Sequence, residues 1–381
     1  MDLIQSFENE LEQLRAGDRM RKLRSITPDG KYAWFENHRL LNLSGNDYLG
    51  LAAENVDCTN FLAEFPEGGC AMTASSSRLL TGTSPAHAGL EALLEELYGR
   101  PALSFNSGYH ANTGILPTLA KRGDLILCDK LNHASIIDGV RLSEADFKRY
   151  PHLDMEQLEK MLEKYRSAYN NIFIITESVF SMDGDVADLA ILAGLKKHYD
   201  ACLIVDEAHG VGTFGDRGLG VCEQYDLIDE IDIIIGTFGK ALASVGAYAI
   251  TNAVIKDYLI NRMRTLIFTT ALPPACAAWS ARMLEKSVGM NKARKHLHKL
   301  SSQLRDELYE KKIDTRGCSH IVPAILGKDE AAVSKAAELR NAGLLVFPIR
   351  PPTVPPGTAR LRFSLNAAMQ WDDIKTISGL L

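Results

Sequence analysis

The sequence predicts an α/β fold with a large, mostly parallel sheet domain and a smaller C-terminal α+β domain. Between about Ala102 and Ile250, short apolar runs alternate with helical patterns. These runs lack alternating polar residues, so we expect strands that are covered on both faces. After the Pro273-Pro274 pair the pattern changes to a charged helix followed by short strands. We therefore place the large domain at residues 46–270 and the small domain at residues 271–381.

The expected elements follow in order along the chain. Residues 1–45 are predicted to be an N-terminal helical segment, because MDLIQSFENELEQLRAGDRMRKLR has an amphipathic pattern. Acidic residues and the lack of an apolar core there argue against a secretion signal. The large domain is predicted to contain strands at residues 102–105, 125–128, 172–176, 202–206, 232–235 and 247–250. A long helix is then predicted from Trp279 to about Lys312, followed by short strands and the proline-rich loop RPPTVPPGTARLRFSL.

The composition indicates a cytoplasmic enzyme. With 381 residues, of which 46% are hydrophobic and 24% charged, the chain can bury a large core. A net charge of -6 argues against binding to a nucleic-acid backbone. The seven cysteines are scattered, and none forms a CxxC pair, so we expect neither a disulfide framework nor a metal site. No apolar run approaches the ~18 residues that span a bilayer, so no membrane role is expected.

Chemically useful side chains lie at the ends of two predicted strands. Asp206 and His209 follow one apolar run, and Thr237 and Lys240 follow the next. Parallel sheets bind ligands at the carboxyl ends of their strands, so we expect these groups in one pocket. A lysine can carry the aldehyde of pyridoxal phosphate as an imine, and an acid can pair with its pyridinium nitrogen. A single lysine after a strand is usually exposed to solvent. Because this lysine is expected to lie near a carboxylate and an imidazole, we predict a pyridoxal phosphate site.

Two other motifs are typical of nucleotide-binding proteins, but the sequence around them does not fit that function. Gly210, Gly212 and Gly215 fit the dinucleotide pattern GxGxxG, but a glycine-rich loop follows where the pattern needs a helix. DEAH is shared with a helicase box, yet the chain has no GxxxxGK[ST] loop to hold phosphates. A nucleotide-binding protein is therefore the weaker alternative.

Seven motifs occur in order along nearly the whole chain: SGNDYLGL, SFNSGYHAN, LNHASIIDG, TESVFSMDGD, DEAHGVGTFG, TFGKA and RPPTVPPGTARLR. Together they resemble the motifs of the α-oxoamine synthases, which are fold-type I pyridoxal phosphate transferases. The resemblance implies a homodimer with shared active sites. It also implies an acyltransferase that joins an amino acid to an acyl thioester with loss of carbon dioxide.

The resemblance assigns roles around the cofactor. It makes Lys240 the cofactor anchor and the base, Asp206 the partner of the ring nitrogen, and His133 the residue stacked on the ring. His133 could also donate a hydrogen bond to the thioester carbonyl. The remaining cofactor contacts implied by the resemblance are Gly108, Tyr109, Ser181, His209, Thr237 and, reaching a second subunit, Thr270.

On the substrate side, the resemblance implies contacts from Arg21, Asn46, His133, Thr353 and Arg362. An arginine suits a carboxylate because its planar fork binds both oxygens. The implied substrates are L-alanine and a pimeloyl thioester, on CoA or on acyl carrier protein, in biotin biosynthesis. A related synthase that uses glycine or serine with another acyl-CoA is the alternative, and a non-catalytic partner subunit is a weaker one. The stretch from Ala74 to Ser76 departs from the family, where a glycine-rich turn is usual.

Overall fold

A computed structural model describes residues 2–17, 19–53, 60–61 and 71–381. Contacts between residues divide the chain into two compact units. The terminal unit contains residues 1–46, 182–184 and 298–381, and the central unit contains residues 47–181 and 185–297. The two units are described separately below.

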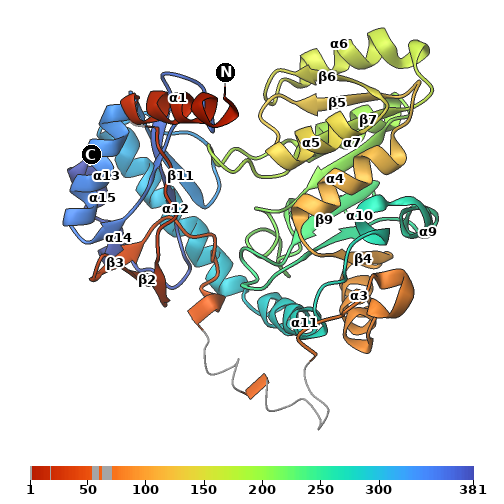
Figure 1. Cartoon of the computed structure of the whole chain (residues 1–381), viewed down its shortest axis with the longest axis horizontal. Helices are drawn as coiled ribbons and strands as arrows, with labels where there is room; N and C mark the ends of the chain where they lie inside the picture. Colours follow the sequence, from red (N-terminus) through yellow and green to blue (C-terminus); the bar gives the residue numbers. More distant parts are fainter. Residues whose placement is uncertain (1, 18, 54–59, 62–70) are drawn as a thin grey trace. The chain divides into compact units, whose positions relative to one another are not determined.

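The central unit is built on a seven-stranded sheet with the order β4-β10-β9-β8-β7-β5-β6 (Figure 1). Its strands are β4 (Ala102–Phe105), β5 (Leu125–Asp129), β6 (Asp146–Tyr150), β7 (Ile172–Glu177), β8 (Cys202–Asp206), β9 (Ile233–Thr237) and β10 (Ala247–Ile250). Strands β5 to β9 pair in parallel. Strand β10 is antiparallel to both of its neighbours, β9 and β4. The mostly parallel sheet predicted from the sequence is confirmed.

Each of the six predicted strands is present, and one strand of this sheet, β6, was missed by the sequence reasoning. Residues of β4, β5 and β8 are almost entirely buried, which explains their continuous apolar runs. Strand β6 lies at the edge of the sheet and reads DFKRY, with several of its side chains exposed. An edge strand needs no apolar run, so its sequence carries little signal.

The central unit also contains helices, several of which pack on this sheet (Figure 1). They are α3 (Pro85–Tyr98), α4 (Gly108–Leu119), α5 (Ala134–Leu142), α6 (Met155–Tyr165), α7 (Leu189–His198), α8 (Val221–Gln224), α9 (Ala253–Arg262), α10 (Arg264–Ile267) and α11 (Pro274–Val288). A core of buried side chains joins α4, α5 and α9 to the strands, with Ile115, Ile136 and Ile204 fully buried. This core fixes the strand ends from which the site residues extend.

The terminal unit contains two small sheets. One has the order β1-β2-β3-β12 and the other β11-β14-β13. The strands are β1 (Thr27–Asp29), β2 (Tyr32–Phe35), β3 (His38–Asn42), β11 (Ile321–Gly327), β12 (Leu344–Leu345), β13 (Pro348–Ile349) and β14 (Ala359–Ser364). The accompanying helices are α1 (Leu3–Ala16), α13 (Asp329–Asn341), α14 (Trp371–Ile374) and α15 (Ile377–Leu380), and α12 (Asn291–Glu310) crosses the boundary between the units along the chain.

The N-terminal segment differs from the helical segment predicted for residues 1–45. The helix ends at Ala16, and three antiparallel strands follow. Gly30 turns the chain between β1 and β2 with φ +60°, and Glu36 and Asn37 turn it between β2 and β3 with φ +49° and +64°. Glycine and asparagine tolerate positive φ, and Asp-Gly is a common hairpin turn. The sequence therefore did contain turn residues typical of hairpins, after the stretch with the helical pattern.

The long helix predicted from Trp279 to Lys312 is two helices. Helix α11 ends at Val288 and α12 begins at Asn291, with Gly289 and Met290 between them. Residues 271–297 belong to the central unit, where α11 packs against α3, and the N-terminal residues group with the C-terminal ones. By contacts, the chain changes unit at 46/47 and 297/298, compared with 45/46 and 270/271 predicted from the sequence. Throughout the described ranges, no helix combines the length and apolarity needed to cross a membrane.

Candidate active site

Lys240 and His209 meet at the carboxyl ends of two adjacent parallel strands. Strand β8 ends at Asp206 and β9 ends at Thr237, and the two strands pair directly. The Lys240 Nζ lies 2.8 Å from His209 Nε2. The other ring nitrogen of His209, Nδ1, lies 2.7 Å from the hydroxyl of Tyr48. Sequence reasoning did not single out Tyr48, although it lies within the motif SGNDYLGL.

The carboxylate of Asp206 is buried and held from two sides. The Nδ2 of Asn112 donates to Oδ2 at 2.8 Å, and the backbone N–H of Ala208 donates to Oδ1 at 2.9 Å. Asn112 also donates to the hydroxyl of Ser135 at 3.0 Å. Asp206 is 5% exposed, so its orientation is set by these partners rather than by water. Asn112 was also missed by sequence reasoning, since its partner is 94 residues away.

His133 begins α5 as its N-cap residue. The backbone N–H of Ser135 donates to His133 Nδ1 at 3.3 Å, which places the ring proton on Nε2. Partial burial and the charge of Lys240 lower the pKa of His133, while Asp206 opposes this. A neutral ring with its proton on Nε2 is a hydrogen-bond donor at that atom.

Glu177 fixes the backbone at His133. Its Oε1 accepts the His133 N–H at 2.6 Å, and the side chain is only 3% exposed. Burial raises the pKa of Glu177, and the nearby Asp206 charge raises it further, whereas Lys240 lowers it. Sequence reasoning missed Glu177, because the contact joins β7 to the loop after β5.

The N-terminus of α4 offers a place for an anion. Ser107 caps the helix by accepting the N–H of His110 at 3.2 Å, and Gly108 and Tyr109 open its first turn. A Cβ at Gly108 would meet no atom within 4 Å, so the space in front of this glycine is open. The Tyr109 hydroxyl donates to Asp138, which raises the pKa of the phenol. Unpaired N–H groups at a helix start suit a phosphate.

The other cofactor residues predicted from the sequence lie in the central unit. The Thr237 hydroxyl donates to the carbonyl of Gly246 at 3.0 Å and accepts the N–H of Gly239 at 3.2 Å. Thr270 is exposed, and its carbonyl accepts a bond of 2.8 Å from Asn106. Ser181 lies in the turn that follows β7.

Apart from His133, which lies in the central unit, the predicted substrate residues lie in the terminal unit. Arg362, on β14, is 8% exposed, and its two terminal nitrogens lie 3.4 and 3.3 Å from Asn46 Oδ1. Arg21 donates to the Thr353 hydroxyl at 3.2 Å. The neighbouring Arg360 forms a buried ion pair with Asp183, so its charge is already matched within the unit.

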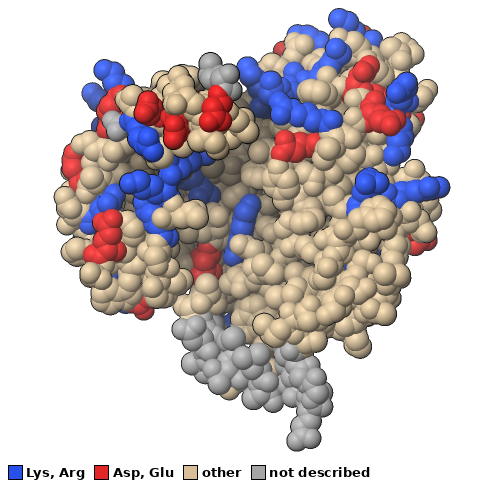
Figure 2. Space-filling model, viewed as in Figure 1, with Lys and Arg blue, Asp and Glu red and all other residues tan. Residues whose placement is uncertain are grey.

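Arg21 and Thr353 line a strongly basic pocket of about 360 Å³. The cationic residues of its wall are Arg19, Arg21, Lys22, Arg24 and Arg350. Figure 2 shows Lys and Arg side chains gathered below α1 on the terminal unit. An adjoining pocket of about 500 Å³ shares Arg19, Met20, Arg21 and Pro351 and is otherwise lined by Leu11, Leu14 and Pro352.

The central-unit residues fit pyridoxal phosphate. An amine (Lys240), a buried carboxylate (Asp206), an imidazole and an open helix start are the groups that bind its aldehyde, ring nitrogen, phenolic oxygen and phosphate. The glycine-rich run after Asp206 does not begin a helix, and residues 207–220 form turns instead. Gly210 and Gly220 pack against the buried Glu207 side chain, so this run is structural rather than a dinucleotide fingerprint.

Comparisons with known proteins agree with this fit. A model of the aminotransferase class I and II family matches residues 38–378. An 8-amino-7-oxononanoate synthase from Chlorobaculum parvum is 51% identical over 387 residues, which cover 100% of this chain and 99% of that protein. A putative 8-amino-7-oxononanoate synthase from Haemophilus influenzae is 48% identical over 374 residues, 98% of each chain.

Solved structures give the same picture. A serine palmitoyltransferase from S. paucimobilis with bound PLP superposes with a TM-score of 0.91 at 30% identity, over 100% of this chain and 97% of that one. An 8-amino-7-oxononanoate synthase from Francisella tularensis superposes with a TM-score of 0.74 at 29% identity, over 90% and 96%. The chain belongs to the aminotransferase class I and II family, and its cofactor is pyridoxal phosphate. Within that family it groups with the 8-amino-7-oxononanoate synthases, the α-oxoamine synthases of biotin biosynthesis.

Proposed function

We propose that this protein condenses L-alanine with a pimeloyl thioester, carried on CoA or acyl carrier protein. The products are 8-amino-7-oxononanoate, carbon dioxide and the free thiol. The observation that carries the proposed substrates is the 51% identity to an 8-amino-7-oxononanoate synthase over the whole chain. The contact between Lys240 and His209 at 2.8 Å, beside the held carboxylate of Asp206, supports the cofactor chemistry that this reaction needs. Bound pyridoxal phosphate supplies an electron sink for the Cα of the amino acid.

Lys240 is the base in this proposal. Its Nζ receives the Cα proton of alanine and returns a proton before product release. His209 orients that amine through Nε2, and the Tyr48 hydroxyl fixes the opposite side of the imidazole at 2.7 Å. Asp206, held by Asn112, would pair with the protonated ring nitrogen of the cofactor.

His133 donates a hydrogen bond during the acyl transfer. Its Nδ1 accepts from Ser135, so its Nε2–H is the donor. As alanine's Cα attacks the thioester, negative charge develops on the carbonyl oxygen, and a fixed donor stabilises that charge. The bond from His133 N–H to Glu177 holds the ring's backbone in place.

The arginines of the terminal unit recognise the carboxylates. Arg362 binds the alanine carboxylate, with Asn46 holding the guanidinium. Arg21 and Thr353 bind the far end of the acyl group, and the basic pocket that they line favours an anionic end. The assembly is a homodimer in which Thr270 of one subunit reaches the cofactor phosphate of the other.

The first experiment measures thiol release from the purified, PLP-loaded protein with L-alanine and pimeloyl-CoA. We expect release that requires alanine, and we expect Lys240→Ala to lower it by roughly 10³- to 10⁴-fold because the general base is lost. Visible absorbance checks that the wild-type protein used in the assay has pyridoxal phosphate bound. Absence of thiol release from a PLP-loaded wild-type protein would contradict the proposal.

A sibling synthase that uses serine or glycine is the second candidate. It is favoured by the serine palmitoyltransferase structure, whose TM-score of 0.91 exceeds that of the Francisella synthase. The relatives at 48% and 51% identity favour alanine and pimeloyl thioester instead. Replacing alanine by serine or glycine, and pimeloyl-CoA by palmitoyl-CoA, in the same thiol assay decides between them.

A further inference from the structure

The backbone around Thr270 is held by distant parts of the chain. The Asn106 side chain donates to the Thr270 carbonyl at 2.8 Å. One residue later, the N–H of Ala271 donates to the carbonyl of Ser76 at 2.9 Å. A Cβ on Gly82 would lie 2.3 Å from that same Ser76 carbonyl, so only glycine lets the chain fold back this closely. The Thr270 segment therefore depends on the segment around residues 76–82.

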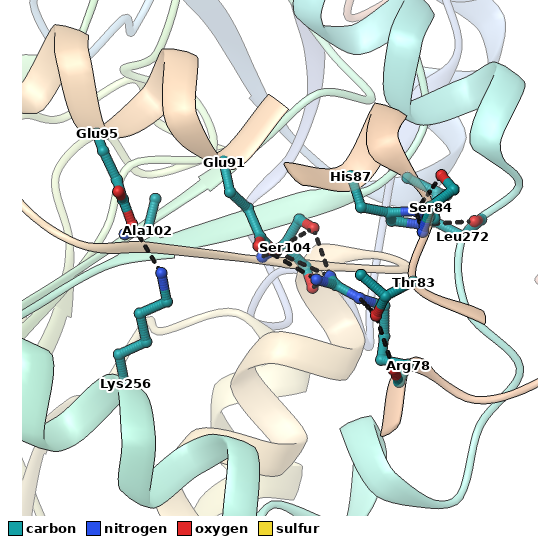
Figure 3. Close-up of polar contacts among 10 residues, drawn as sticks. All are labelled: Arg78, Thr83, Ser84, His87, Glu91, Glu95, Ala102, Ser104, Lys256 and Leu272. Atoms are coloured by element: carbon teal, nitrogen blue, oxygen red, sulfur yellow. Dashed lines mark hydrogen bonds and ion pairs between the residues drawn. The ribbon is translucent and has the colours of Figure 1, made fainter. Parts of the chain in front are cut away.

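His87 provides a third anchor beside Thr270. Its Nδ1 accepts the N–H of Ser84 at 3.2 Å, so the ring proton is on Nε2, which donates to the carbonyl of Leu272 at 2.9 Å. The ring is fully buried, and this burial lowers the pKa of His87. His87 is thus a neutral, directed donor to the Thr270 segment (Figure 3).

Arg78 ties these anchors to strand β4. Its two terminal nitrogens bind the two carboxylate oxygens of Glu91 at 2.9 and 3.1 Å. Arg78 also donates to the hydroxyl of Ser104 at 2.9 Å, and Glu91 accepts the Ser104 N–H and hydroxyl at 2.8 Å each. Figure 3 shows the three side chains converging between α3 and β4. The Arg78 and Glu91 side chains are only 12% and 13% exposed, so the pair is partly shielded from water.

The contacts form a closed circuit through the proposed phosphate site. Ser104 precedes Asn106 by two residues on the way to Gly108, and Asn106 binds the Thr270 carbonyl. From Thr270 the circuit returns through Ala271 and Ser76 to Arg78. The circuit thus joins the α4 start, which would bind the phosphate of one subunit, to Thr270, which would reach the phosphate of the other.

We propose that Arg78, with Glu91, is a positioning residue for the phosphate of pyridoxal phosphate. The pair fixes the spacing between the α4 start and the Thr270 segment without touching the cofactor. This inference rests on the proposed function, in which Gly108 and Thr270 are phosphate contacts.

The same helix and strand supply a matched control. Glu95, one turn after Glu91 on α3, pairs with Lys256 at 2.7 Å and accepts the N–H of Ala102 at 3.1 Å. Ala102 begins β4, at the end of the strand away from Gly108. Glu95 therefore anchors the same strand to the same helix, but outside the circuit (Figure 3).

The experiment compares apo protein carrying Arg78→Lys, Glu91→Gln or Glu95→Gln with the wild type. Each is titrated with pyridoxal phosphate and with pyridoxal, which lacks the phosphate, and binding is followed by visible absorbance. We expect Arg78→Lys and Glu91→Gln to weaken pyridoxal phosphate binding by about tenfold, the equivalent of one charge-assisted hydrogen bond, and to leave pyridoxal binding unchanged. Glu95→Gln should change neither.

Thermal unfolding of all four proteins separates positioning from stability. The proposal is supported if the Arg78 and Glu91 variants lose their preference for pyridoxal phosphate over pyridoxal. Their Tm should then be similar to that of Glu95→Gln. Equal weakening of both ligands, or equal weakening by Glu95→Gln, would overturn it. A wild type that binds pyridoxal phosphate but releases no thiol would contradict the proposed substrates, while the selectivity ratio would still decide the role of Arg78.

Discussion

The contacts around Lys240 and those around Arg21 differ in length and in burial. In the central unit, the contacts of His209 with Lys240 and Tyr48 and that of Asp206 with Asn112 are 2.7 to 2.8 Å long. In the terminal unit, the contact of Arg21 with Thr353 is 3.2 Å long, between exposed residues.

The difference indicates that the cofactor residues are more preorganised for binding than the substrate residues around Arg21. Short contacts among buried and half-buried side chains hold the cofactor residues in place without the cofactor, which lowers the reorganisation needed when charge develops. Exposed contacts at 3.2 Å are weaker and are replaced readily by a ligand carboxylate. Substitutions at the first cluster should therefore change turnover, and substitutions at the second should change the KM for substrate.

The largest effect in this comparison is expected from Asp206→Asn. The change keeps the shape of the side chain but removes the charge opposite the cofactor ring nitrogen, so thiol release should fall by roughly 10²- to 10³-fold. The matched control is Asp232→Asn at the other end of the sheet, where Asp232 accepts the Leu203 N–H at 2.7 Å. A similar loss of turnover in both variants would mean that the sheet, and not the site, had been damaged.

An effect of intermediate size is expected from His152, on the free energy of unfolding and not on turnover. Its ring contacts Asp129 at 2.9 Å and Asp185 at 3.1 Å, and these join the loop that leads to His133 with the loop that contains Ser181. Burial lowers the pKa of His152, but the two carboxylates outweigh it and raise the pKa to about 9. The folded protein therefore binds a proton that the unfolded chain loses near pH 6.5.

The sign of the pH dependence follows from this. The stabilisation is fully present below about pH 6.5 and is lost as the pH rises through about 9, in total on the order of 3 kcal/mol. Urea unfolding at pH 6.5 and pH 9 should show this fall in the wild type and a much smaller fall in His152→Gln. Identical pH dependence in the two proteins would contradict the assignment.

The smallest effect is expected from Thr353→Val. The variant loses the 3.2 Å bond from Arg21, so the KM for pimeloyl-CoA should rise about two- to fivefold while kcat stays the same. Thr358→Val is the control from the same loop, because the Thr358 hydroxyl donates to the nearby Pro355 carbonyl at 2.7 Å. A fall in kcat for Thr353→Val would place this residue closer to the reaction than the comparison allows.

The sequence predicted the sheet well because its strands are buried on both faces. Strands β4, β5, β7, β8, β9 and β10 all appear where continuous apolar runs predicted them, within two residues at either end. Edge strand β6 and the N-terminal hairpins were missed, because exposed strands have no such run and a helical pattern preceded the hairpins. Local pattern predicts an element best where packing requires the same residue type at every position.

The sequence by itself determined the family and its cofactor. Lys240, Asp206 and His209 were identified from their positions after apolar strands, a relation that is local in the chain. Only the tertiary structure showed that Asn112 holds Asp206, that Tyr48 holds His209, and that Glu177 holds the backbone of His133. These contacts join residues between 44 and 161 positions apart. Their pairing depends on how strands and helices pack, which short-range pattern does not contain.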